Sequence, residues 1–167
     1  AGYGDLTDLK GKVFAFTDPE SNTGKLVPTF WLKQLGATPE GYFRKTIYSY
    51  SHDNAIMAVA ESLVDGAAVH SLIWDHYQRH NPEHAVRTRV IKTSMPFGNP
   101  PLVASDGLSR EAREGIRAVL LAMHDDPTGR PILEALMIDR FVPPEEDWYA
   151  PIVKMKQALK GDPPEPS

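Results

Sequence analysis

Short polar side chains at two places in this sequence are of the types that bind an oxyanion. At the first place, Ser21, Asn22 and Thr23 offer hydroxyl and amide donors directly before Gly24, within residues 18–24. The first backbone N–H groups of a helix have no intrahelical partners, and the helix dipole adds partial positive charge to them. Because small side chains let an anion approach these donors closely, residues 18–24 predict an oxyanion-binding turn at the start of a helix.

A plain helix cap is the alternative for the same residues. Ser, Thr, Asn and Asp are preferred at helix N-termini, and a capped helix requires no ligand. Judged on residues 18–24 alone, the cap is favoured over the binding turn. A nucleotide-binding P-loop is excluded, because that motif requires a glycine where Pro19 stands and a Ser or Thr where Leu26 stands.

The second place is Ser51-His52, where a hydroxyl group stands beside an imidazole. Serine hydroxyls and backbone N–H groups would donate to a tetrahedral oxyanion. A ring nitrogen of His52 could donate as well, and more strongly when the ring is protonated. A capping role for His52 is the alternative. Adjacency in the sequence does not establish the geometry of a catalytic pair, so no catalytic residue is predicted.

The elements around these two places alternate between strand and helix. Hydrophobic spacing and β-branched residues predict three strands and the helices between them, in the order strand 13–16, helix 26–35, strand 46–49, helix 55–63 and strand 67–69. Such alternation is typical of right-handed crossovers, so we predict an α/β fold with a mostly parallel sheet flanked by helices. Ligands of such sheets lie beyond the carboxyl ends of the strands, where both polar places would then meet.

The rest of the chain predicts further strands and then helices. Expected are a helix from residue 72 that ends near Pro82, strands at 89–93 and 101–104, and helices from 109, at 131–137 and at 149–159. Residues 161–167 are proline-rich and polar, which predicts a disordered tail. The expected organisation is a single α/β ligand-binding lobe over residues 1–160, followed by this tail.

Composition narrows the classes of partner. The 167 residues suit one domain with a proper core or two very small domains. The 18 Lys+Arg against 22 Asp+Glu leave no basic field for nucleic acid. Disulfides and thiolate metal sites are excluded because the chain has no cysteine. No apolar run approaches the length of a transmembrane helix, and the start of the chain carries no signal-peptide pattern. A small anion would therefore be held by local dipoles and hydrogen bonds.

A histidine-rich stretch invites comparison with a metal site. His76 and His80 are four residues apart, a spacing that zinc can use, but Pro82 interrupts the helix before His84. No glutamate stands between the first two histidines as in the zinc-protease motif. A solvated helix face is the better interpretation, and we predict neither a metal nor a cofactor.

Several ordered motifs of the chain also match those of a known family. They lie at residues 8–12, 14–16, 18–24, 26–28, 48–53, 58–60, 64–69, 129–130, 141–143 and 147–149. Together they cover nearly the whole chain and resemble the phosphate/phosphite/phosphonate substrate-binding proteins of ABC transporters. The resemblance implies one lobe of a type II periplasmic-binding-protein fold, in which two lobes close on a phosphorus oxyanion.

The resemblance carries site residues over to this chain. Its oxyanion-binding loop falls on Ser21, Asn22 and Thr23, and its binding histidine on His52. The chain departs from relatives at His70, where many have an acidic or polar cleft residue, and at Asn99, where a relative that binds an amine-bearing phosphonate has aspartate. These departures leave phosphate, phosphite or a phosphonate with a neutral substituent. The predicted ligand-binding residues are Ser21, Asn22, Thr23, Gly24, Ser51, His52, His70 and Asn99.

The resemblance also implies partners and a location. The chain would be the substrate-binding component of an ABC transporter, or a fragment of it, with a small oxyanion as ligand, a permease as partner and an extracytoplasmic, typically periplasmic, location. It would not be an enzyme. The family's first lobe precedes the segment that matches here, so an extracytoplasmic sensory domain that reuses this lobe is the alternative. A lone lobe would bind weakly, and its exposed cleft face would favour a homodimer.

Overall fold

The computed structural model describes residues 2–161, which form two compact units. The first unit takes in residues 2–96 and 151–161, and the second takes in residues 97–150. The sequence predicted one ligand-binding lobe over residues 1–160. That both units belong to a single lobe stays a prediction. Nearly all of the predicted tail, residues 162–167, lies outside the described residues.

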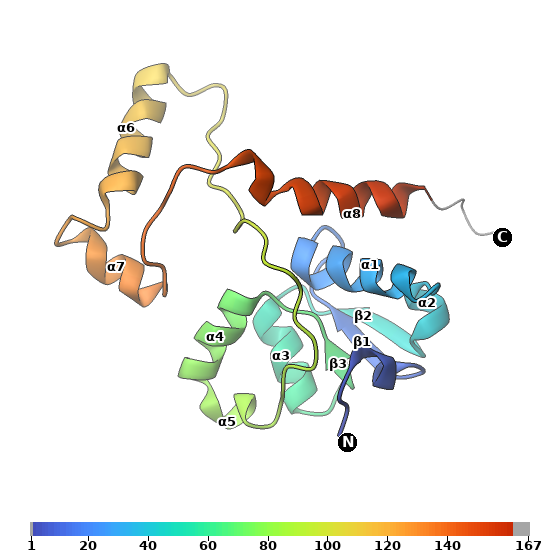
Figure 1. Ribbon diagram of the computed structural model, residues 1–167. Helices are drawn as coiled ribbons and strands as arrows, with labels where there is room; N and C mark the ends of the chain where they lie inside the picture. The colour runs from blue at the N-terminus through green and yellow to red at the C-terminus, as the bar shows by residue number, and fades with distance from the viewer. Residues whose placement is uncertain (1, 162–167) are drawn as a thin grey trace. The chain divides into compact units, whose positions relative to one another are not determined.

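A three-stranded parallel sheet lies at the centre of the first unit (Figure 1). Its strands are β1 Val13–Phe16, β2 Lys45–Tyr48 and β3 Gly66–Ala67, in the order β2-β1-β3. Both neighbours pair with β1 in parallel. The predicted α/β class with a mostly parallel sheet flanked by helices is confirmed.

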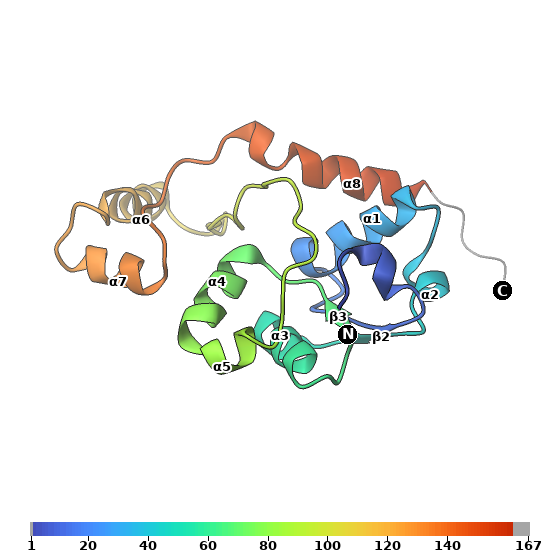
Figure 2. The same cartoon turned by 60° about the horizontal axis from the view of Figure 1, so that its bottom comes forward.

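The sheet is covered on both faces, as Figures 1 and 2 show, with α1 and α2 on one side and α3 on the other. The elements of this unit are η1 Leu6–Leu9, η2 Asn22–Leu26, α1 Val27–Gln34, α2 Pro39–Tyr42, α3 His52–Ala60, α4 Ser71–His80, α5 Pro82–Ala85 and α8 Ala150–Lys160, the last entering it at residue 151. Gly36 follows the C-cap of α1 with a φ of +69°, so this helix ends close to the end predicted at residue 35. No helix of the described chain is long and apolar enough to cross a bilayer.

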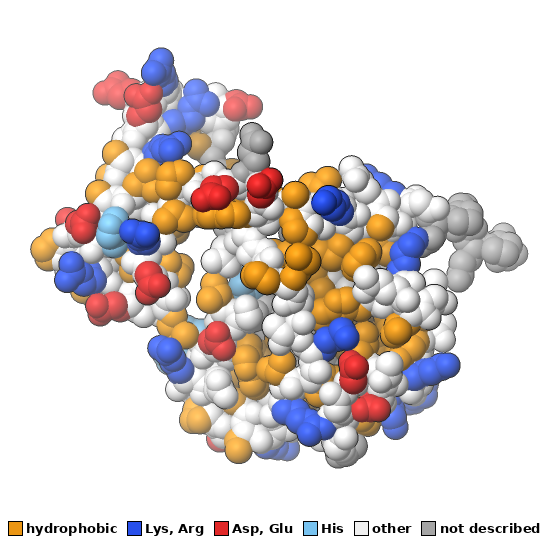
Figure 3. All heavy atoms as spheres, in the orientation of Figure 1, with side chains coloured by type: hydrophobic (Ala, Val, Ile, Leu, Met, Phe, Trp, Pro, Cys, Tyr) orange, Lys and Arg blue, Asp and Glu red, His pale blue; other side chains and the backbone are white. Residues whose placement is uncertain are grey.

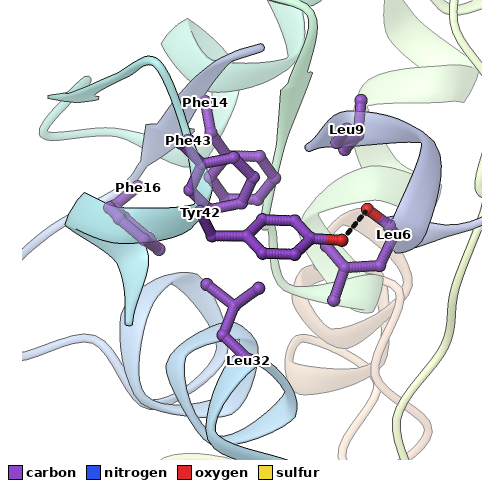
Figure 4. Close-up of a cluster of buried hydrophobic side chains, with 7 residues drawn as sticks. All are labelled: Leu6, Leu9, Phe14, Phe16, Leu32, Tyr42 and Phe43. Carbon is purple, nitrogen blue, oxygen red and sulfur yellow. Dashed lines mark hydrogen bonds between the residues drawn. The ribbon is translucent and has the colours of Figure 1, made fainter. Parts of the chain in front are cut away.

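The core of this unit lies on the face of the sheet that carries Phe14 and Phe16. Alternate residues of a strand point to opposite faces, so these two rings share one face while Ala15 points to the other. The ring of Phe14 stacks on that of Phe43 with 4.5 Å between centroids. Figure 4 shows the cluster, in which the Tyr42 hydroxyl donates a hydrogen bond to the carbonyl oxygen of Leu6 at 3.4 Å. Its members are Leu6, Leu9, Phe14, Phe16, Leu32, Tyr42 and Phe43.

The predicted fourth and fifth strands are wrong. Residues 89–93 and 101–104 have no regular secondary structure and pair with no strand among the described residues. The first segment instead packs by its side chains, since Ile91 lies against the core cluster and Lys92 Nζ lies 5.4 Å from the ring centroid of Trp31. A strand requires a partner with free backbone groups, and β-branched composition alone does not supply one.

The second unit is helical and has little core of its own. Its elements are α6 Arg110–Ala122, α7 Gly129–Ala135 and η3 Glu146–Trp148. The helix α6 has no buried residue, whereas Leu133 of α7 is 1% exposed. Figure 3 shows hydrophobic side chains on the surface of this unit, and its exposed apolar residues include Ile116, Val119, Ile132 and Leu136.

Candidate oxyanion-binding site

A turn follows each of the three strands of the sheet, and the first two turns are rich in polar groups whereas the third carries His70. The turns are residues 18–24 after β1, residues 49–51 after β2 and residues 68–70 after β3, and each leads into a helix. Because all strands run in parallel, the turns lie at one edge of the sheet. Ser49 N donates to Phe16 O at 2.9 Å and Ala68 N donates to Ala15 O at 3.2 Å, which holds the neighbouring turns to the end of β1. The predicted convergence at one edge is confirmed.

The 18–24 turn is closed by its own side chains. Asp18 Oδ1 accepts a hydrogen bond from Glu20 N at 2.8 Å, and Ser21 Oγ accepts one from Gly24 N at 2.9 Å. Ser21 has extended backbone angles, φ −68° and ψ 126°, as an N-cap residue does. The cap alternative is therefore correct for the oxygen of Ser21.

The cap leaves several donors of this turn unused. The Ser21 hydroxyl accepts through its oxygen, so its proton remains available to a ligand. The N–H groups of Asn22 and Thr23, at the start of η2, donate to no partner among residues 2–161. A single turn of π-helix, η2, runs directly into α1, so these N–H groups stand at the positive end of a continuous helical segment. Capping and anion binding are compatible here.

Gly24 serves a packing purpose that the sequence did not predict. A Cβ atom at this position would lie 1.6 Å from Oγ1 of Thr17, because the turn passes close over the end of β1. Gly24 is buried, and its N–H is already bonded to Ser21. Its predicted direct contact with a ligand stays a prediction. Thr17 Oγ1 is itself buried, with no hydrogen-bond partner in the described chain.

The 49–51 turn has a strained backbone and a serine cap. Tyr50 has a φ of +55°, which is rare for a residue other than glycine. The Ser49 hydroxyl donates to Ser51 O at 2.8 Å, and Ser51 Oγ accepts a hydrogen bond from Asn54 N at 3.4 Å. Ser51 is the N-cap of α3, and His52 is the first residue of that helix. The hydroxyl proton of Ser51 and the first N–H groups of α3 therefore lie at the same sheet edge.

His52 and His70 are joined by a backbone hydrogen bond. His70 N donates to His52 Nδ1 at 3.1 Å, and the ring centroids lie 6.2 Å apart. His70 also caps α4, since its Nδ1 accepts a hydrogen bond from Leu72 N at 3.1 Å. Burial lowers the pKa of both histidines below the ordinary value of 6.5; for His52 the nearby His70 lowers the pKa further and Asp53 partly opposes this. Both rings are therefore neutral at neutral pH.

Two further residues at this edge were missed by reasoning from the sequence. Lys25 Nζ lies 4.0 Å from the ring centroid of Phe16 and 5.5 Å from that of Tyr48, which places a positive charge near the ends of β1 and β2. Its position directly after Gly24 was the available signal. Tyr50 is 73% exposed beside the cap of α3, and no sequence pattern indicates a positive φ at a tyrosine.

A hollow beside the 18–24 turn adds a second lysine. It lies between this turn and α8, where Lys25 and Lys156 both line it. The side-chain oxygen of Thr29 is buried there without a hydrogen-bond partner in the described part of the chain. The lining residues are Pro19, Glu20, Ser21, Lys25, Leu26, Thr29, Lys156 and Leu159. The hollow therefore brings two positive charges and the negative charge of Glu20 next to the turn.

Asn99 and the histidine-rich stretch belong to parts of the chain other than the three turns. Asn99 belongs to the second unit, where its carbonyl oxygen accepts a hydrogen bond from the Tyr149 hydroxyl at 3.0 Å, so its assignment to the site stays a prediction. The exposed rings of His76 and His80 on α4 are stacked with 4.1 Å between centroids. Across residues 2–161, no group of three or more His, Cys, Asp or Glu side chains is placed to hold a metal ion.

Comparison with known proteins gives one family and several related structures. The family described as ABC transporter, phosphonate, periplasmic substrate-binding protein matches residues 1–149. A probable ABC transporter phosphite-binding protein of Prochlorococcus marinus is 24% identical over 160 residues, which are 92% of this chain and 54% of that protein. The chain thus spans about half the length of this relative.

Two solved structures share the fold. The same Prochlorococcus marinus protein, solved in complex with methylphosphonate, superposes with a TM-score of 0.82 at 23% identity, covering 93% of this chain and 59% of that one. A binding protein component of an ABC phosphonate transporter from Pseudomonas aeruginosa superposes with a TM-score of 0.77 at 25% identity, covering 93% of this chain and 51% of that one. The predicted resemblance to a periplasmic-binding-protein lobe is confirmed.

Proposed function

This chain belongs to the family of periplasmic substrate-binding proteins of ABC phosphonate transporters, and we propose that it binds a phosphorus oxyanion at the carboxyl edge of its sheet. The ligand would be a phosphonate, phosphite or phosphate. One relative from Prochlorococcus marinus supports this class, since it is described as a probable phosphite-binding protein and its structure is solved in complex with methylphosphonate. The chain would act as the ligand-binding part of a transporter, outside the cytoplasm and in contact with a permease.

The observation that carries the proposal is the set of unused donors at this edge. The Ser21 and Ser51 hydroxyls, the first N–H groups of η2 and α3, and the ring of His52 all belong to turns at the ends of neighbouring strands. A tetrahedral oxyanion offers acceptors in several directions, which a set of donors from separate turns can satisfy. Lys25 adds a positive charge at the ends of β1 and β2.

The proposed role is binding, with no chemical step. The three turns present donors, and no nucleophile with an adjacent base is positioned among them in the described residues. The family match favours transport over the sensory alternative. A homodimer through the cleft face stays a prediction. We expect this chain to bind weakly, because in a two-lobed protein part of the affinity comes from the lobe that closes over the ligand.

Titration by nuclear magnetic resonance tests the proposal on the chain of 167 residues. Phosphate, phosphite and methylphosphonate are added in the millimolar range, with sodium chloride at matched ionic strength as the control. We expect the backbone N–H signals of Asn22, Thr23, His52 and Asp53 to shift with the oxyanions and not with chloride. A folded chain whose signals respond to none of the three oxyanions would show the proposed function to be wrong.

A further inference from the structure

His52 and His70 are held in place by the backbone and not by other side chains. His52 Nδ1 accepts a hydrogen bond from His70 N, and His70 Nδ1 accepts one from Leu72 N, both at 3.1 Å. The rings meet at an interplanar angle of 78°. Each ring is therefore fixed at the nitrogen that faces the protein.

These hydrogen bonds determine which ring nitrogen carries the proton. A backbone N–H can only donate, so the Nδ1 atom that accepts it must be unprotonated, and a neutral imidazole then carries its hydrogen on Nε2. In the described chain neither Nε2 atom has a hydrogen-bond partner, and neither belongs to the polar atoms buried without one. Both Nε2–H groups are thus open to solvent or to a ligand. The lowered pKa of each ring supports the neutral form.

We propose that His52 and His70 form a fixed pair of neutral Nε2–H donors, which selects oxyanions that present acceptor oxygens and discriminates against ligands that bring an ammonium group to this place. The inference rests on the proposed function, since it concerns the same site. An ammonium group can only donate, so it finds no acceptor on either ring. His70 thereby becomes a specificity-determining residue in addition to its capping of α4.

The charged groups near the pair are few. Asp53, in the first turn of α3, raises the pKa of His52, but less than burial and His70 lower it, and its side chain is exposed. The first turn of α4 holds no acidic residue. A cationic substituent would therefore meet two N–H donors and, at most, one carboxylate that solvent screens.

The tautomers can be measured without any ligand. Long-range proton–nitrogen correlation spectra of the isotope-labelled chain at neutral pH distinguish Nε2–H, Nδ1–H and imidazolium rings. We expect His52 and His70 to give the neutral Nε2–H pattern. An Nδ1–H or doubly protonated ring at either position would overturn the proposal, whatever the ligand titrations show.

Ligand titrations with matched variants test the selectivity. His70→Asn keeps an oxygen at the position where Nδ1 accepts from Leu72 N, so the cap survives, but it removes the Nε2–H donor. His52→Asn likewise keeps an acceptor for His70 N and removes the Nε2–H donor of that ring. We expect each variant to bind methylphosphonate about 10- to 100-fold more weakly than the unmodified chain does, with unchanged thermal unfolding. His80→Asn, at the exposed end of α4, is the control and should bind normally.

Aminoethylphosphonate is the second probe. We expect the unmodified chain to bind it at least about 10-fold more weakly than methylphosphonate, and His70→Glu to narrow that ratio because a carboxylate accepts from ammonium. Equal affinity of the unmodified chain for both probes, or unchanged methylphosphonate binding in His70→Asn, would overturn the selectivity while leaving the proposed function intact. Binding of neither probe nor phosphate would overturn the proposed function and the selectivity together.

Discussion

The 18–24 turn and the pair of His52 and His70 bring two kinds of donor to the same edge of the sheet. The turn offers backbone N–H groups and hydroxyls, which keep their protons at any ordinary pH. The histidine pair offers ring N–H groups, whose number and charge depend on pH. Close packing of Gly24 on Thr17 supports the turn, whereas backbone hydrogen bonds to Nδ1 support the rings.

Under the proposed function, we infer from this difference that the two regions contribute differently to ligand recognition. A rigid, always-protonated turn can hold any tetrahedral oxyanion, because its donors make no distinction among acceptor oxygens. A pair of rings with one open donor each can distinguish ligands by what else they carry. The turn should therefore contribute most of the affinity, and the rings most of the selectivity.

The sharpest way to break this division is to remove the hydroxyls of the turn. Ser21→Ala together with Thr23→Ala should weaken oxyanion binding, because each lost charge-assisted hydrogen bond contributes about 1.5–3 kcal/mol. Loss of the Ser21 cap should lower the free energy of unfolding by only about 1 kcal/mol. Calorimetry with methylphosphonate and urea denaturation measure the two effects. Unchanged affinity with reduced stability would mean that these residues only cap the helix.

Filling the space at Gly24 tests the packing that supports the turn. Gly24→Ala should lower the free energy of unfolding by about 3 kcal/mol, because the new Cβ would clash with a buried threonine beneath it. Gly2→Ala is the matched control, since a Cβ there would meet nothing within 4 Å. Urea denaturation of both variants measures the difference. Equal stability would show that the turn moves freely away from β1.

Changing pH should separate the rings from the turn. Because the folded-state pKa of His52 and His70 lies below the ordinary 6.5, the unfolded chain takes up protons first as the pH falls. The stability from these groups is present above that value and is lost as the pH decreases below it. The urea midpoint should therefore decrease when the pH is lowered from neutral to mildly acidic. The decrease should be smaller in the double variant His52→Asn/His70→Asn. An identical pH profile for this variant would contradict the assignment.

The smallest expected effect concerns the buried hydroxyl of Thr17. Thr17→Val replaces an oxygen that has no partner in the described chain with a methyl group of similar size, which should raise the free energy of unfolding by about 1 kcal/mol. Ligand affinity should not change if the turn binds through its outer donors alone. Urea denaturation and calorimetry check both points. A loss of affinity would extend the site inward to this residue.

The fold was predictable from local patterns where the chain supplies its own partners. Strand Val13–Phe16 was predicted with both ends correct, because a short apolar run between turn residues is typical of a buried strand. The strands expected at 89–93 and 101–104 were wrong, because a strand depends on a neighbour that composition does not reveal. Likewise η1 was missed, although Asp5 and Asp8 form a reciprocal cap at its start.

The candidate site was predictable in its members and not in their arrangement. Ser21 and Ser51 were expected at helix starts because short polar side chains favour those positions, and both are N-caps. The hydrogen bond from His70 N to His52 Nδ1 joins residues from different turns, and only the crossover of the chain brings them together. Lys25 lies over two rings for the same reason.

The sequence by itself determined the alternation of strands and helices, the polar residues at the strand ends and the family to which the chain belongs. These follow from local preference and from ordered motifs, which can be recognised without coordinates. Only the tertiary structure decided that the backbone passes too close to Thr17 for a Cβ at Gly24, that Tyr50 adopts a positive φ, and that Nδ1 of both His52 and His70 accepts a backbone N–H. Each of these depends on atoms distant in the chain or on a single backbone angle, which hydrophobic spacing does not specify.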